Sequence, residues 1–80
     1  MRRIKFKHKR NRGVWGLAFP DEFRIELDPE LDERLKLEIA CHEAMHVLLP
    51  AFPEDTINEF GKIQSDLLWR IGFRLKDEEE

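Results

Sequence analysis

The sequence predicts an α+β fold, in which a short antiparallel three-stranded sheet is followed by two helices. Two observations carry this prediction. In the first third of the chain, apolar and charged residues alternate with the period of a half-buried strand, and turn signals separate three such stretches. In the remainder, two start signals made of Pro and acidic residues each precede a long stretch with helical periodicity.

The three predicted strands are short. The first alternates apolar and basic residues over 3–9, the second is the apolar stretch 14–19, and the third alternates over 23–27. Gly16, inside the second stretch, predicts a β-bulge. Because the connections are short, an antiparallel meander is the simplest arrangement of the three strands.

The two predicted helices have clear boundaries. The first begins with Asp28 as N-cap and Pro29 in the first turn, and it ends before Pro50. The second begins after Pro53 and ends at Gly72, a residue typical of a C-terminal cap. The apolar stripe predicted to be buried on the second helix consists of Ile57, Phe60, Gly61, Gln64, Leu67, Leu68 and Ile71. A glycine within this stripe costs about 1 kcal/mol relative to alanine and predicts close approach of another helix.

Composition predicts one small globular domain over 1–76 and an acidic tail over 77–80. Apolar residues make up 41% and charged residues 39% of the chain, which is typical of a folded domain. No apolar run approaches the roughly 20 residues of a membrane span, so no membrane partner is expected. A single cysteine, Cys41, excludes an internal disulfide and favours the cytoplasm. Because a disulfide is excluded, a bound metal is the kind of cross-link that could stabilise a core of this size.

The charges are unevenly distributed. Residues 1–12 carry +7, whereas residues 13–80 carry −10. A basic segment of this kind can bind nucleic acid. The interpretation we favour is a solvated edge strand that its lysines protect against aggregation.

Three polar side chains interrupt the apolar second half of the first predicted helix: His42, Glu43 and His46. Burying them without partners costs several kcal/mol in total, roughly. Two histidines at i and i+4 project from one helix face, so both imidazoles can reach one zinc ion. Glu43 is rotated by about 100° from His42, which places it beside the metal, where it can take a proton from a metal-bound water. This is the H-E-x-x-H arrangement of zinc hydrolases.

A zinc hydrolase site needs a third protein ligand and an open position for water. The candidate acids are Glu54, Asp55 and Glu59. The metzincin spacing places Phe52 where a third histidine belongs, and His8 lies on a distant strand. On a regular helix Glu54 shares the face of the buried stripe, whereas Glu59 is about 200° from Ile57. Asp55 is nearer the stripe than Glu59 but has a shorter side chain, so Glu54 is our choice.

These motifs resemble a known class of enzymes. The segment 42–46, followed within a short stretch by an acid on a second helix, resembles the gluzincin branch of the zincin peptidases. The segment 54–61 is similar to the second-helix pattern E-x-x-A-N-x-F-A of the ImmA/IrrE-type peptidases, which are HExxH proteins linked to repressor cleavage. Ile57 and Gly61 replace the two alanines of that pattern. Residues 14–73 also resemble the minimal HExxH proteins of phage and prophage genomes.

The resemblance implies a minimal zincin-like fold and a zinc-dependent peptidase that acts on a protein or peptide. His42 and His46 are then zinc ligands, and Glu43 is the general base. Many zincins stabilise the oxyanion with Tyr or His; this chain has no Tyr, which leaves His8 or an arginine. Two alternatives stay open. One is a non-catalytic domain stabilised by zinc, and the other is a phage-associated regulator that binds nucleic acid or a repressor through its basic strand.

Overall fold

The computed structural model describes residues 1–74. The elements in chain order are β1 (Lys5–His8), β2 (Gly16–Phe19), the short 3₁₀ helix η1 (Pro20–Glu22), β3 (Arg24–Leu27), α1 (Glu33–Leu48) and α2 (Glu54–Ile71). The fold is α+β, as predicted. The expected end of the domain at residue 76 and the expected acidic tail over 77–80 lie outside the described residues.

The sheet is mixed, so the predicted antiparallel meander is wrong. Its strand order is β1-β3-β2, with β3 parallel to β1 and antiparallel to β2. The central position falls to the strand with the most buried residues: Ile25, Glu26 and Leu27 are each 5% exposed or less. The lysine-rich β1 takes one edge, where its charged side chains reach water.

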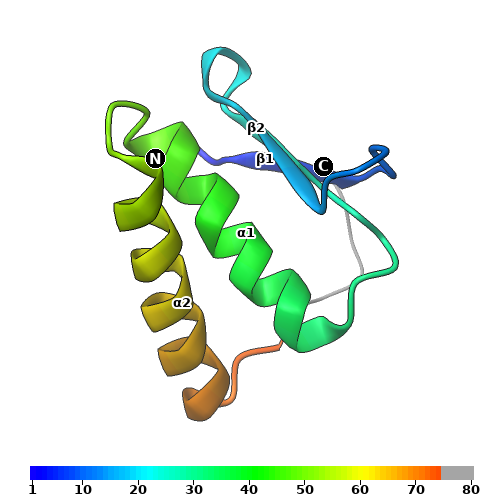
Figure 1. The fold of residues 1–80 in the computed structure, drawn as a ribbon, viewed down its shortest axis with the longest axis vertical. Coiled ribbons are helices and arrows are strands. Elements are labelled where there is room, and N and C mark those ends of the chain that lie inside the picture. The colour runs from blue at the N-terminus through cyan, green and yellow to red at the C-terminus, as the bar shows by residue number, and fades with distance from the viewer. Residues whose placement is uncertain (75–80) are drawn as a thin grey trace.

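The two helices form two further layers beside the sheet (Figure 1). α1 packs against β2 and β3 on one side and against α2 on the other, whereas α2 makes little contact with the sheet. The core between the sheet and α1 contains Ile25, Leu27 and Val47, with Phe6 and Ile39 packed against them. α2 is therefore the outer layer, and α1 is held on two sides.

Gly16 lets β2 lie directly on α1. A Cβ atom at this position would lie 2.7 Å from Cγ2 of Ile39 and 3.0 Å from Cγ of Glu43. Gly16 is in regular register with Leu27, so the bulge predicted there is absent. The glycine serves close packing of strand and helix instead.

α1 begins one turn later than predicted. Its N-cap is Asp32, whose side chain accepts a hydrogen bond of 2.8 Å from the backbone N–H of Leu35. Asp28, the predicted cap, instead accepts a hydrogen bond of 2.8 Å from the backbone N–H of Glu30 in the preceding turn. The C-terminal cap of α2 is Gly72, as predicted; its φ of 111° lies in the left-handed region that favours glycine.

The stripe predicted for α2 is only partly buried. α1 covers the face that carries Ile57, Gly61 and Ser65. A Cβ at Gly61 would lie 3.3 Å from Cα of His42, which confirms the predicted close approach of a second helix. Of the other members of the stripe, Leu68 is half-buried, and four are exposed to solvent: Phe60, Gln64, Leu67 and Ile71. Neither described helix is long and apolar enough to span a membrane.

Candidate metal centre

His42 and His46 lie one turn apart on α1 and point the same way. Their Nε2 atoms are 3.2 Å apart, and the ring centroids are 4.9 Å apart. Both side chains are largely buried, with 15% and 25% of their surface exposed. The spacing of i and i+4 therefore brings the two imidazoles together on one face of the helix.

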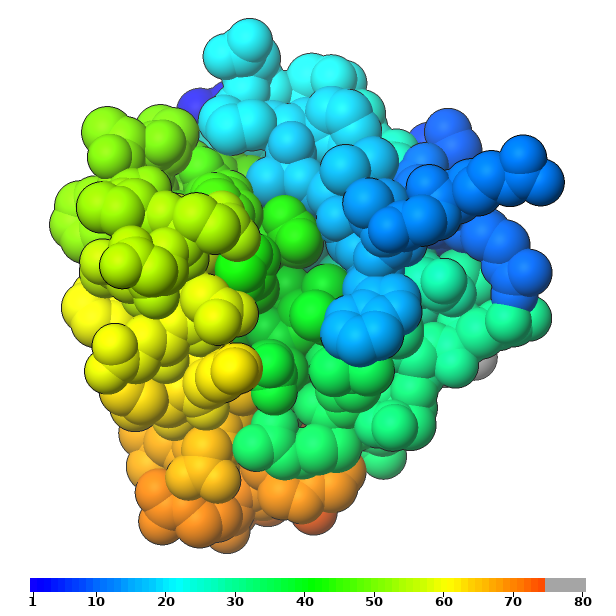
Figure 2. All heavy atoms as spheres, viewed as in Figure 1, coloured from blue at the N-terminus to red at the C-terminus, as the bar shows by residue number. Residues whose placement is uncertain are grey.

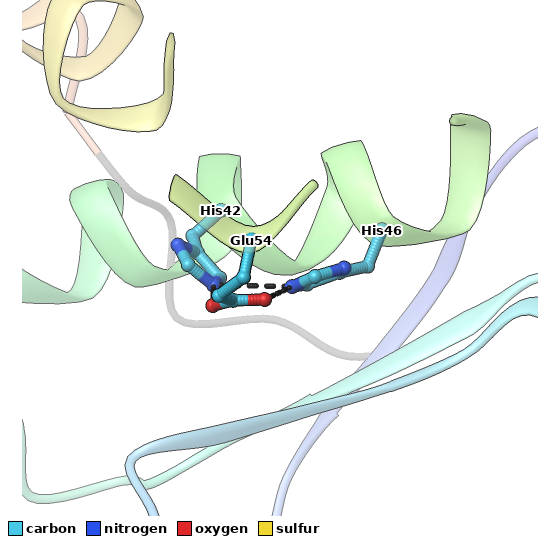
Figure 3. A group of neighbouring side chains, drawn as sticks. All are labelled: His42, His46 and Glu54. Carbon is cyan, nitrogen blue, oxygen red and sulfur yellow. Dashed lines mark hydrogen bonds and ion pairs between the residues drawn. The ribbon is translucent and has the colours of Figure 1, made fainter. Parts of the chain in front are cut away.

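Glu54, in the first turn of α2, completes the cluster (Figure 3). Its Oε1 lies 2.9 Å from Nε2 of His42, and its Oε2 lies 2.8 Å from Nε2 of His46. The close approach of the helices at Gly61, on the same face of α2 as Glu54, brings the carboxylate over the histidines. Glu54 is 67% exposed, so the cluster is open to solvent on this side.

The two other acids considered for this position lie elsewhere. The carboxylate of Asp55 accepts a hydrogen bond of 2.9 Å from the backbone N–H of Thr56. Glu59 is exposed on α2. Among the described residues, the one group of three side chains that could hold a metal ion is formed by His42, His46 and Glu54.

The donor set fits a tetrahedral zinc ion. Zinc–ligand bonds of 2.0–2.1 Å in a tetrahedron place neighbouring donor atoms about 3.3–3.4 Å apart. In this structure the Nε2 atoms of His42 and His46 are 3.2 Å apart, and the two carboxylate oxygens of Glu54 contact them separately, Oε1 at 2.9 Å from His42 and Oε2 at 2.8 Å from His46. The histidine pair is therefore within a few tenths of an ångström of its zinc-binding separation, and one ligand atom from each of the three residues lies within 4.8 Å of the others. Two imidazole nitrogens and a carboxylate oxygen are also donors that zinc accepts.

Glu43 lies between the histidines and strand β2. It lines a pocket of about 300 Å³ with His42, Ile39 and the segment 13–16. Burial raises the pKa of the Glu43 carboxyl above its ordinary value; the two histidines oppose this shift, and Glu54 adds to it. Within residues 1–74, no hydrogen bond or ion pair engages this carboxylate.

Strand β2 offers a free edge beside this pocket. The backbone N–H of Asp28 donates to the carbonyl of Trp15 at 2.9 Å. In an antiparallel ladder hydrogen-bonded and non-hydrogen-bonded residue pairs alternate, so Leu17 turns its backbone groups toward β3. Gly16 and Ala18 then turn their N–H and C=O groups to the free edge. The sequence did not assign residues 13–16 to the site, although an apolar pair between two glycines was a usable signal.

His8 does not belong to the cluster. It lies on β1, where its Nε2 is 3.2 Å from Nζ of Lys36. It lines a separate groove of about 520 Å³ between β1 and α1. His8 is therefore neither near the histidine pair nor placed as a helper beside Glu43.

Part of the basic N-terminal segment is paired within the chain. Glu26, on the sheet face away from α1, has Nζ of Lys7 at 3.8 Å and is hydrogen-bonded to Arg24. Arg10 forms an ion pair with Glu30. These pairs reduce the positive charge that the segment offers to a nucleic acid.

Comparison with known protein families, with curated protein sequences and with solved structures finds no match.

Proposed function

We propose that this chain is a zinc-dependent metallopeptidase of gluzincin type that hydrolyses a protein or peptide in the cytoplasm. His42, His46 and Glu54 hold the zinc ion, and Glu43 is the general base. The observation that carries the proposal is the convergence of these three donor atoms, on two helices, beside a half-buried carboxylate without partners among the described residues.

The substrate adds to the free edge of β2 as an extended strand. Backbone N–H and C=O groups of Gly16 and Ala18 supply the hydrogen bonds of such a pairing. The pocket lined by Ile39, Trp15 and Glu43 adjoins this edge. A substrate peptide bond that lies beside Gly16 is therefore close to Glu43.

The reaction is hydrolysis of an amide. Bound zinc supplies Lewis-acid chemistry, which polarises a carbonyl and lowers the pKa of a water. Glu43 accepts a proton from the attacking water as its oxygen bonds to the carbonyl carbon. The same residue then gives this proton to the amide nitrogen as the C–N bond breaks, which releases a carboxylic acid and an amine; the acid then loses its proton to the amine, so that the products are a carboxylate and an ammonium group.

A non-catalytic zinc domain is the second candidate, and one observation favours it. The carboxylate of Glu54 already connects the two helices by contacting both histidines. A metal ion at this position would fasten α2 to α1 whether or not it took part in a reaction. Metal content and hydrolysis therefore need separate measurements.

The test begins with metal analysis of protein purified without added zinc, for which we expect about one zinc per chain. Zinc titration of Glu54→Ala is then compared with Glu59→Ala, an exposed acid on the same helix. We expect Glu54→Ala to lose at least about tenfold in zinc affinity, since it removes one of three ligands, and Glu59→Ala to match the parent. A chain that holds no zinc, and whose melting temperature does not change when zinc is added, would refute the proposal.

A further inference from the structure

α2 carries a second apolar stripe that faces solvent. Phe60, Ile63, Leu67 and Ile71 are 41–62% exposed. At 100° per residue they fall within an arc of about 80°, centred about 115° from the face that packs on α1. The atoms of α2, yellow to orange in Figure 2, form one flank of the molecule. None of the other described elements covers this stripe.

Such a stripe differs from scattered surface apolar residues. Its members recur at i, i+3, i+7 and i+11, which is the spacing of a helix that packs against another helix. Contiguous exposed apolar patches mark interaction sites in soluble proteins. The pattern therefore indicates a helical partner that lies along α2.

We propose that the partner is the α2 helix of a second copy of this chain, packed antiparallel about a two-fold axis beside residues 64–66. In that arrangement Phe60 of one copy lies opposite Ile71 of the other, and Ile63 lies opposite Leu67. A two-fold interface must be self-complementary. This condition is met, because each of the four side chains lies opposite another member of the same stripe.

The charges beside the stripe favour the same arrangement. Glu59 and Arg70 lie on the same flank, rotated by about 85° and 65° from its centre. An antiparallel helix pair brings equivalent flanks together, whereas a parallel pair brings opposite flanks together. The antiparallel pair therefore places Glu59 of each copy opposite Arg70 of the other. In a parallel pair this flank faces the uncharged side chains of Gln64 and Leu68.

Asp66 lies on this flank near the proposed axis, where it would approach its own copy. Its charge is compensated within the chain. Nε of Arg70 donates to Oδ2 of Asp66 at 2.9 Å, and Arg34 lies 3.7 Å from Oδ1. The repulsion between two copies of Asp66 is thereby reduced. The proposal does not depend on the metal centre.

The test is sedimentation velocity on the full chain from micromolar to millimolar concentration. We expect a concentration-dependent equilibrium between monomer and dimer. Ile63→Asp should raise the dissociation constant about a hundredfold or more, since each dimer loses two buried side chains and buries two carboxylates. Lys62→Asp, on the same helix but away from the stripe, should leave it nearly unchanged. Circular dichroism checks that Ile63→Asp is folded, as expected for a side chain that is 59% exposed.

Charge reversal tests the orientation. Glu59→Arg and Arg70→Glu should each weaken the dimer about threefold to tenfold, since exposed ion pairs contribute little individually. The double variant should bind more tightly than either single variant, and it should fall short of the parent because Arg70 no longer compensates the charge of Asp66. A chain that stays monomeric at millimolar concentration, a dimer that Ile63→Asp leaves intact, or a series of larger aggregates would overturn the proposal. Single charge reversals without effect would overturn the antiparallel arrangement.

Discussion

Two carboxylates on opposite faces of the sheet have opposite surroundings. Glu26 is 3% exposed; Nδ2 of Asn11 donates to it at 3.0 Å and Arg24 donates to its other oxygen. Burial alone raises its pKa, but the hydrogen bonds from Asn11 and Arg24 and the charge of Lys9 outweigh burial, so the pKa lies below its ordinary value. Glu43 has no such partner among residues 1–74, and burial keeps its pKa above its ordinary value.

The difference lies in partners, because both side chains are partly or fully removed from water. A carboxylate that accepts hydrogen bonds from fixed donors stabilises the fold and has no free lone pair in the direction of a ligand. A carboxylate that faces a pocket without donors costs the fold stability and remains available to a substrate. Glu26 is therefore held by the fold, whereas Glu43 faces a pocket and has no partner among residues 1–74, as the proposed role of general base requires.

The largest effect is expected from Glu43→Gln, which keeps the shape of the side chain and removes the base. Hydrolysis of a disordered protein such as casein should fall by about 10²–10⁴, the typical contribution of a general base. Zinc affinity and melting temperature should stay near those of the parent, since no described residue depends on this carboxylate. Glu38→Gln, on the same helix, is the matched control. Full activity in Glu43→Gln would remove Glu43 from the role of base.

The same substitution on the other face should have the opposite outcome. Glu26→Gln should lower the free energy of unfolding by about 2 kcal/mol, because Arg24 loses its buried charged acceptor and Lys7 loses the opposite charge of its ion pair. For a domain of this size that corresponds to a melting temperature lower by roughly 10 °C. Zinc content and hydrolysis per folded molecule should be unchanged. Urea unfolding at neutral pH measures the loss.

The effect of Glu26→Gln should also depend on pH. A group whose pKa is lowered by folding contributes stability above its unfolded pKa, and that stability is lost as the pH falls through the folded value. The parent should therefore lose the stabilisation by ionised Glu26 as the pH falls below the ordinary glutamate pKa of 4.5. The variant has no ionisable group at this position, so its stability should not change for this reason. The gap between the two unfolding free energies should close in acid. A gap that stays constant down to pH of about 3 would contradict the assignment.

The sequence predicted the position of Glu54 but not the burial of Glu26. Glu54 follows from helix phase, because one buried residue on a regular helix fixes which neighbours share its face. Glu26 occupies the polar face of an alternating strand, which predicts exposure. It is buried because Asn11, in a turn far away in sequence, reaches its carboxylate. Local periodicity contains no information about such a contact.

For related reasons, local sequence patterns could not predict the order of the strands in the sheet or which face of α2 is covered by α1. Short connections favoured pairing of strands that are neighbours in sequence. In the structure β3 instead lies between β1 and β2, and this central position buries Ile25 and Leu27. On α2 the pattern shows which residues are apolar but not which arc α1 covers. Ile57 is fully buried, whereas Phe60, three residues later, is 41% exposed. Tertiary packing decides between the two arcs.

The smallest effect on stability is expected where the fold and the metal centre meet, at Gly61. A Cβ there would lie 3.3 Å from the backbone N and Cα of His42 and 3.4 Å from its Cβ. In Gly61→Ala the helices must therefore separate by a few tenths of an ångström, which opposes a gain in helix propensity of about 1 kcal/mol. The two effects nearly cancel in the free energy of unfolding.

They do not cancel at the metal centre, because Glu54 lies two turns earlier on the same face of α2. A shift of α2 carries its carboxylate away from His42 and His46, so zinc affinity should fall by roughly threefold to tenfold, a few tenths of an ångström being a large error in a metal–ligand bond. Gly72→Ala is the control with the opposite pattern. It strains a residue with φ of 111° that has no neighbour within 4 Å, so it should cost about 1 kcal/mol of stability and leave zinc affinity unchanged. Calorimetric zinc titration and urea unfolding of both variants measure the four values. If Gly61→Ala bound zinc as tightly as the parent, the close approach of the helices would not be what positions Glu54.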